Sequence, residues 1–116
     1  MRSSTEIDLA GAADTLAALR AMDRDGRLLA RLREAFERTL ARQQPRLQAA
    51  RQQQPDRAAL AEAMHVLKSA AVQLGGTELL QSCARLEQCS DLELPACLTD
   101  FDERLADFRA TLAHWT

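Results

Sequence analysis

The chain has 116 residues, a length that suits one domain with a single hydrophobic core and is too short for two. Charged residues make up 28% and apolar residues 47%, and the net charge of −2 arises from interleaved acids and bases, which favours a globular domain over a disordered one. Aromatic residues make up only 3%, with no basic patch around them, and no apolar run approaches the roughly 20 residues of a membrane span, so we expect neither nucleic-acid binding nor a membrane segment nor a signal peptide.

The residue types that dominate the chain favour helices: alanine, leucine, arginine, glutamine and glutamate. Signals for β-strands are nearly absent, since there are two valines, one isoleucine and no tyrosine. No stretch alternates apolar and polar residues with the period of two that strands require. The sequence therefore predicts an all-α fold.

Two helices are predicted in the first half of the chain. The first is short, from about residue 8 to residue 20, and Gly11 weakens its apolar stripe. A polar turn follows, and the second helix runs from about residue 27 to residue 53. Pro45 inside it removes a backbone donor and predicts a kink or a break. Its buried side is predicted to carry Leu28, Leu29, Leu32, Ala35, Phe36, Thr39, Leu40 and Leu47.

The third helix is predicted from about residue 56 to residue 74. Asp56 is a plausible N-cap, because its carboxylate can accept a hydrogen bond from a backbone N–H group of the first turn. Gly75 and Gly76 follow directly, and glycine commonly ends a helix in this way. We therefore assign Gly75 a structural role.

Two more helices complete the chain. Thr77 is predicted to cap the fourth helix, which runs to about residue 88, and Pro95 fits the first position of a fifth helix that runs to about residue 114. Short connections between amphipathic helices indicate antiparallel neighbours. We predict a single domain over residues 1–116, with a core of about residues 7–113. Its architecture would be an antiparallel up-down four-helix bundle with the short N-terminal helix capping one end.

The cysteines and histidines offer no metal site. Cys83, Cys89 and Cys97 are odd in number and lack the spacing of metal ligands, so we expect free thiols in a reducing cytoplasm. His65 and His114 are the only histidines, whereas a zinc site needs three or four ligands. We assign His114 an ordinary place at the end of a helix.

His65 is predicted to lie on the solvent face of the third helix. At about 100° per residue, the apolar positions of this helix gather on the side opposite His65. The exposed face then consists of small or mildly apolar residues, with Glu62 and Lys68 at its flanks. A small apolar patch around an exposed ring suggests a docking surface. The predicted core side is Leu60, Ala63, Leu67, Ala70, Ala71 and Leu74, and the neighbours of His65 are Ala58, Ala61, Ser69 and Val72.

These residues suit the acceptance of a phosphoryl group. Imidazole is a good nucleophile near neutral pH, and Lys68, three residues after His65, can place a cation beside an incoming charge. Phosphoryl transfer needs little beyond alignment and neutralisation of charge. However, an exposed histidine near a lysine is also an ordinary surface arrangement, so the helical wheel alone leaves both interpretations open.

Residues 63–87, AMHVLKSAAVQLGGTELLQSCARLE, resemble the signature of histidine-containing phosphotransfer (HPt) domains. That family shows a histidine, then leucine two residues on, lysine three on, a small residue four on and glycine ten on. The matching residues are His65, Leu67, Lys68, Ser69 and Gly75, and the Leu-Glu pair that often follows is matched by Leu86 and Glu87. With the upstream stretches IDLAGAADTLAAL and LLARLREAF, the resemblance covers about residues 7–113.

Ser69 departs from the family pattern, which usually has glycine after the lysine. Serine adds only a hydroxymethyl group beside the ring, so we expect a mild change that slows or tunes docking. Its hydroxyl could donate a hydrogen bond to the imidazole or to a phosphoryl oxygen.

The resemblance implies a phosphoryl carrier in a multistep two-component phosphorelay. A response-regulator receiver domain, with its own Mg²⁺, would pass phosphate from an aspartate to His65, which would pass it to an aspartate of another receiver. Lys68 would stabilise the phosphoryl oxygens. Gln73 and Glu87 could lie near the site or be ordinary solvated residues. No glycine-rich phosphate loop occurs, so we expect no ATP site, no enzyme activity and no cofactor. The partner-docking residues would be Ala58, Ala61, Glu62, Ser69, Val72 and Gln73.

Two other interpretations stay open. The first is an adaptor, a helical bundle that binds a receiver or kinase partner without phosphate on His65. The second is the dimerisation bundle of a sensor kinase, although five helices suffice to complete a bundle within one chain. We expect a cytoplasmic monomer without direct membrane contact, either free-standing or the C-terminal domain of a membrane-bound hybrid sensor histidine kinase acting in cis.

Overall fold

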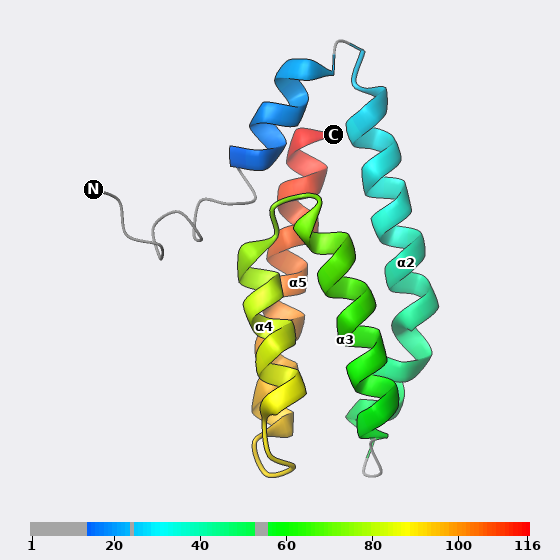
Figure 1. The fold of residues 1–116 in the computed structure, drawn as a ribbon, viewed down its shortest axis with the longest axis vertical. Coiled ribbons are helices and arrows are strands. Elements are labelled where there is room, and N and C mark those ends of the chain that lie inside the picture. The colour runs from blue at the N-terminus through cyan, green and yellow to red at the C-terminus, as the bar shows by residue number, and fades with distance from the viewer. Residues whose placement is uncertain (1–13, 24, 53–55) are drawn as a thin grey trace, which may run out of the picture.

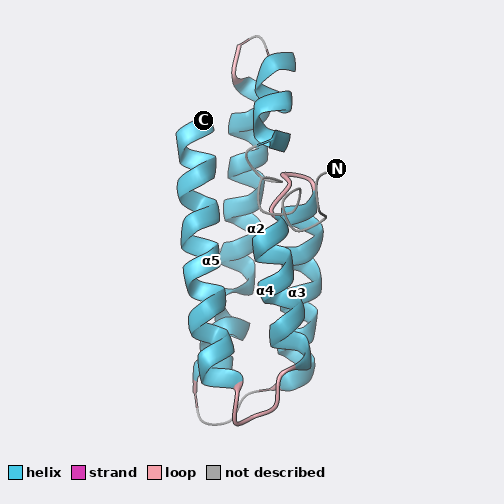
Figure 2. Cartoon of the chain, turned by 90° about the vertical axis from the view of Figure 1, so that its left-hand side faces the viewer, coloured by secondary structure: helices cyan, strands magenta, loops and turns pink. Residues whose placement is uncertain are grey.

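A computed structural model describes residues 14–23, 25–52 and 56–116. Its long elements are α2 (Arg27–Arg51), α3 (Arg57–Val72), α4 (Thr77–Gln88) and α5 (Leu94–Trp115), and residues 14–22 are also helical. No strand occurs among the described residues, as Figure 2 also shows, so the predicted all-α class is confirmed.

The four labelled helices form an antiparallel bundle in chain order, and α5 returns to pack against α2 (Figure 1). The helix of residues 14–22 lies at the end of the bundle where α2 begins and α5 ends (Figure 1). This arrangement is the predicted up-down bundle with a short N-terminal helix at one end. Residues 8–13 of that predicted helix, with Gly11, lie outside the described residues. None of the described helices is long and apolar enough to cross a membrane.

One hydrophobic core unites all of these helices. The rings of Phe36 on α2 and Phe108 on α5 meet edge to face, with their centroids 5.1 Å apart. Leu16 is fully buried and ties the helix of residues 14–22 to the same core. Burial of such large apolar side chains is the main stabilising contribution to a domain of this size. Further members are Leu40, Leu47, Leu60, Leu67, Leu79, Leu86, Leu98, Phe101, Leu105 and Leu112.

The ends of α3 follow the sequence prediction closely. The carboxylate of Asp56 accepts a hydrogen bond from the backbone N–H of Ala59 at 3.1 Å, which makes Asp56 the N-cap. Gly75 has a φ of +71°, a left-handed conformation that glycine adopts without strain. A Cβ atom at Gly76 would lie 2.8 Å from Cε1 of Phe108, so a larger residue there would clash. The two glycines therefore allow the sharp, closely packed turn between α3 and α4.

Two predicted helix starts need correction. Thr77 is not the cap of α4 but its first helical residue; Gly76 is the N-cap, and the Thr77 hydroxyl donates to the carbonyl oxygen of Gly75 at 3.4 Å. The hydroxyl therefore points back into the turn and leaves the first N–H groups of α4 without a side-chain cap. Helix α5 begins at Leu94, one residue before Pro95. Proline is still within the first turn, where its missing N–H costs no helical hydrogen bond.

Helix α2 continues through Pro45, so of the two outcomes predicted there, a kink or a break, the break does not occur. Pro45 is exposed, and solvent can satisfy the carbonyl group that a proline leaves without a partner. The predicted buried stripe is also wrong at Leu28, which is 42% exposed, and at Ala35, which is exposed. Gln43 is buried instead, and its amide oxygen accepts from the Arg46 guanidinium at 3.0 Å. The helical wheel misses this because, among the labelled helices, α2 packs against α3 and α5, which cover a narrower part of its surface than the apolar stripe predicts.

Candidate functional site

His65 lies on the exposed face of α3, opposite the face that packs in the core. The buried residues of this helix are Leu60, Ala63, Met64, Leu67 and Ala71, whereas Ala70 is only partly buried. Met64 precedes His65 directly and was not part of the predicted core side. With both Met64 and Leu67 anchored in the core, the backbone of α3 holds the imidazole outward, as the helical wheel predicts.

On the α4 side of His65, Lys68 is engaged in an ion pair. Its ammonium nitrogen lies 2.7 Å from Oε1 of Glu87, and the two side chains are 30% and 28% exposed. Glu87 lies near the end of α4, so this contact joins the two helices beside the imidazole. The structure therefore brings Glu87 to the site, while the ammonium of Lys68 is held by a carboxylate rather than left free.

Cys83 lies beneath this ion pair. It is fully buried one turn before Glu87 on α4, and burial raises the pKa of its thiol to about 12. The charge of Lys68 opposes that rise and the charge of Glu87 adds to it, which places Cys83 close to both groups. Because the thiol stays protonated at neutral pH, Cys83 acts as a small apolar residue of the core.

On the α2 side of His65, a second ion pair borders the site. Nη2 of Arg46 lies 3.2 Å from Oε2 of Glu62. Together with Ala61, His65 and Val66, these two residues line a hollow of about 420 Å³, which we call the His65 hollow. Arg46 was missed by the sequence reasoning, because it lies on a different helix and only the packing of α2 against α3 brings it beside His65.

A neighbouring groove lies between α2 and α3. It has a volume of about 260 Å³, and Val66 lines both this α2–α3 groove and the His65 hollow, so the two adjoin. Ser69 and Gln73 border the groove from α3, and Ala35, the residue wrongly predicted to be buried, borders it from α2. Its other lining residues are Leu32, Phe36, Thr39, Ala70 and Leu74.

The predicted docking residues on α3 are exposed. Ala61 and Ser69, one turn before and one turn after His65, are small, so they leave open space around the imidazole. Val72 is 59% exposed. The Ser69 hydroxyl donates to the backbone carbonyl of His65 at 3.1 Å. It therefore points along the helix, and the expectation that it donates to the imidazole is not met. The exposed set comprises Ala58, Ala61, Glu62, Ser69, Val72 and Gln73.

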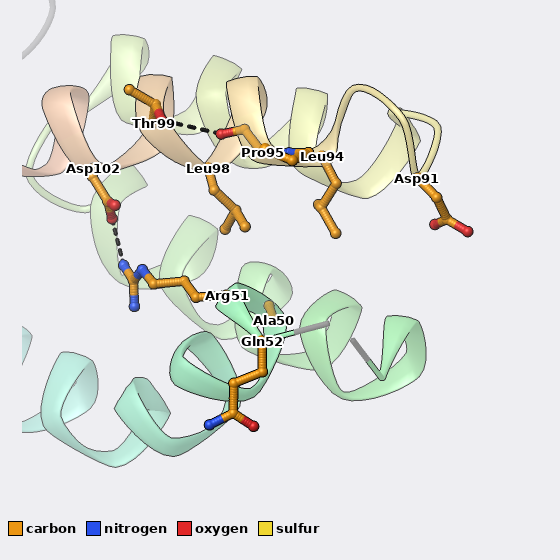
Figure 3. Close-up of a pocket in the computed structure, with 9 residues that line it drawn as sticks. All are labelled: Ala50, Arg51, Gln52, Asp91, Leu94, Pro95, Leu98, Thr99 and Asp102. Atoms are coloured by element: carbon orange, nitrogen blue, oxygen red, sulfur yellow. Dashed lines mark hydrogen bonds and ion pairs between the residues drawn. The ribbon is translucent and has the colours of Figure 1, made fainter. Parts of the chain in front are cut away.

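Other features of the described residues do not compete with this site. No group of three or more histidine, cysteine or acidic residues among them could hold a metal ion. His114 lies in the last turn of α5, where its ring meets Trp115 edge to face. A hollow of about 510 Å³ lies between the end of α2 and the start of α5 (Figure 3). An ion pair between Arg51 and Asp102 spans it, and no histidine or cysteine lines it.

Comparison with known protein families gives one match. The family model described as Hpt domain matches residues 31–115, which is most of the chain and includes His65, Lys68 and Glu87. Neither the curated proteins nor the solved structures provide a match.

Proposed function

Because this chain belongs to the Hpt domain family, whose members are phosphotransfer carriers of two-component phosphorelays, we propose that His65 is the residue that carries the phosphoryl group. A receiver domain docks on the exposed face of α3 and passes the group from its aspartate to His65, and an aspartate of a second receiver removes it. The observation that carries this proposal is the outward position of His65 among small neighbours, with Ala61 and Ser69 one turn away on either side.

The transfer step needs only one ring nitrogen of His65 from this chain. The unprotonated nitrogen attacks phosphorus in line, the P–N bond forms, and the P–O bond to the aspartate breaks with its electron pair left on the carboxylate. The proton on the other ring nitrogen is then lost to solvent. The Mg²⁺ that neutralises the phosphoryl oxygens belongs to the receiver, and the partner, not an ATP site in this domain, supplies the phosphoryl group.

Lys68 serves the transfer step by leaving Glu87 and pairing with the phosphoryl group. A phosphoryl group carries nearly two negative charges, whereas Glu87 carries one, so the ammonium gains by turning toward the phosphoryl oxygens. A partly exposed ion pair contributes on the order of 1 kcal/mol, which makes the exchange cheap. Glu87 therefore keeps the long Lys68 side chain beside the imidazole until the phosphoryl group arrives.

The His65 hollow and the α2–α3 groove together form the docking surface. Arg46 and Glu62 present one charge of each sign next to the imidazole, and the groove beyond them has Ala35 and Gln73 at its border. A receiver brings its own aspartate to this surface, so the guanidinium of Arg46 can exchange Glu62 for a receiver carboxylate. Electrostatic contacts of this kind accelerate docking and select partners more than they strengthen binding.

The test is transfer from a phosphorylated receiver to the purified domain. The wild-type chain should acquire a label that is labile in acid and stable in base, as expected of a phosphoramidate. His65→Gln should abolish the label while leaving the helical circular dichroism signal intact, and His114→Gln, the matched control, should retain it. A receiver that binds without labelling the wild type would instead support the adaptor.

A further inference from the structure

Two cysteines flank the turn between α4 and α5. Cys89 is the C-cap of α4, and Cys97 lies in the first turns of α5, four residues after the turn ends at Glu93. Both side chains are partly buried against the hydrophobic core at the same end of the bundle, and Cys89 raises the pKa of the Cys97 thiol, as expected of two neighbouring thiols. The function proposed for His65 uses neither of them.

Contacts from two helices hold the sulfur of Cys89. Nη1 of Arg57, at the start of α3, donates to Sγ of Cys89 at 3.9 Å, and Nη2 donates to the carbonyl oxygen of the same residue. The Cys89 thiol donates to the carbonyl of Leu86 at 3.5 Å. These contacts fix the position of the sulfur and place a guanidinium group beside it, and cationic neighbours of this kind are typical of reactive cysteines.

We propose that Cys89 and Cys97 are a thiol modification site that closes to an intramolecular disulfide when the protein meets a hydroperoxide. The sulfur of Cys89 attacks one peroxide oxygen: the S–O bond forms, the O–O bond breaks, and the thiol proton leaves with the departing oxygen as water. The sulfur of Cys97 then attacks that of Cys89: the S–S bond forms, the S–O bond breaks, and a second water leaves. Two thiols and one hydrogen peroxide thus give one disulfide and two waters.

The environments of the two sulfurs indicate which cysteine reacts first. Desolvation raises the pKa of the Cys97 thiol, and Cys89 raises it further, so Cys97 is the slower nucleophile toward peroxide. It therefore acts second, on the oxidised sulfur of Cys89, and its proton leaves with the hydroxyl group as water. Arg57 contacts the sulfur of Cys89, so a peroxide that reaches this sulfur meets a cationic hydrogen-bond donor beside it. Cys83 takes no part, because it is fully buried beneath the ion pair of Lys68 and Glu87.

Mass spectrometry of the intact chain tests this proposal directly. After hydrogen peroxide treatment under native conditions and alkylation, trypsin releases both cysteines in one peptide, residues 86–104, and Cys83 in another, residues 69–85. We expect peptide 86–104 to be two hydrogen atoms lighter and unalkylated, and dithiothreitol to restore both alkylation sites. Its closure should be roughly tenfold faster than in urea-unfolded protein, since the fold holds the sulfurs together.

Variants with a single change identify the partners. Cys89→Ser and Cys97→Ser should each leave the other cysteine open to alkylation after peroxide, whereas Cys83→Ala should close its disulfide as the wild type does. Circular dichroism checks that each variant is folded. Disulfide-linked dimers, oxygen atoms added to peptide 86–104 without loss of hydrogen, or an unchanged peptide would each overturn the proposal.

Discussion

At the scale of single residues, two ion pairs border His65. Lys68, on α3 itself, is paired with Glu87 of α4, and Arg46, on α2, is paired with Glu62 of α3. Neither pair is buried deeply enough for its rupture to cost much, so both cations remain available to an anionic partner. Substitutions of the two cations should differ in their effect, because we propose that Lys68 serves the phosphoryl group and that Arg46 serves docking.

Lys68→Gln should slow phosphoryl transfer within the docked complex. Loss of one donor that stabilises developing charge in a water-excluded site lowers a rate by about a hundredfold to a thousandfold, and we expect a smaller loss, at least about tenfold, for the partly exposed Lys68. Single-turnover transfer from an excess of phosphorylated receiver gives the rate constant, and Lys68→Arg, which keeps the charge, should recover part of it. Transfer by Lys68→Gln at the wild-type rate would show that the ammonium has no part in the chemistry.

Arg46→Gln should weaken receiver docking and leave the maximal transfer rate nearly unchanged. The apparent dissociation constant should rise about three- to tenfold, as expected for a partly exposed charge pair worth on the order of 1 kcal/mol. Arg42→Gln on the same helix is the matched control, since Arg42 contacts only Thr39 among its hydrogen-bond partners in the described chain. Equal effects of the two substitutions would argue against a specific role for Arg46.

At the scale of helices, the sequence predicted well which helices form and in what order. It predicted less well which face of each helix is buried. Asp56 and Gly75 could be predicted because a cap and a left-handed turn are local events, determined by residues within one turn. Leu28, Ala35 and Gln43 could not, because the exposure of a residue on α2 depends on which helices flank it. Thr77 was mistaken for a cap because a hydroxyl can donate backward to a carbonyl as readily as it can accept from an N–H group.

The start of α2 should be sensitive to acid through Asp23. Its buried carboxylate accepts a hydrogen bond from the backbone N–H of Leu29 at 3.0 Å, and this bond lowers the pKa of Asp23 below its ordinary value of 3.8. A lowered pKa means stability that is present above the ordinary value and is lost as the pH falls through the lower, folded-state value. Asp23→Ala should therefore reduce the thermal midpoint at pH 7.

Thermal unfolding followed by circular dichroism from pH 7 to pH 2 measures this effect. The difference in midpoint between wild type and Asp23→Ala should shrink toward the acid end. The exposed Asp25 in the same turn provides the control, and Asp25→Ala should change the midpoint little at any pH. A wild-type advantage that persists unchanged at pH 2 would contradict the role assigned to the carboxylate.

At the scale of the whole molecule, the packing of α2 and α4 on either side of α3 brings the charged residues of the site together. The sequence could predict that His65 points outward, because this follows from the period of one helix. It could not predict that α2 would bring Arg46 to one side, and it left open whether α4 would bring Glu87 to the other, because such contacts exist only after the bundle closes. His65, Lys68 and Glu62 were therefore predictable from one helix, Arg46 was not, and Glu87 was left open.

The completeness of the bundle predicts a monomer. The four labelled helices of one chain already surround a single core, whereas the dimerisation bundle of a sensor kinase needs helices from two chains. Sedimentation equilibrium at micromolar to millimolar concentrations should give the mass of one chain. A stable dimer would favour the dimerisation bundle and weigh against an independent carrier.

The most direct test of the central claim is to locate the phosphoryl group after transfer. Trypsin places His65 in the peptide of residues 58–68 and His114 in the peptide of residues 110–116. Mass spectrometry at alkaline pH should find one phosphoryl group on peptide 58–68, and brief acid treatment should remove it. A phosphoryl group on any other peptide, or none after a receiver has docked, would contradict the account.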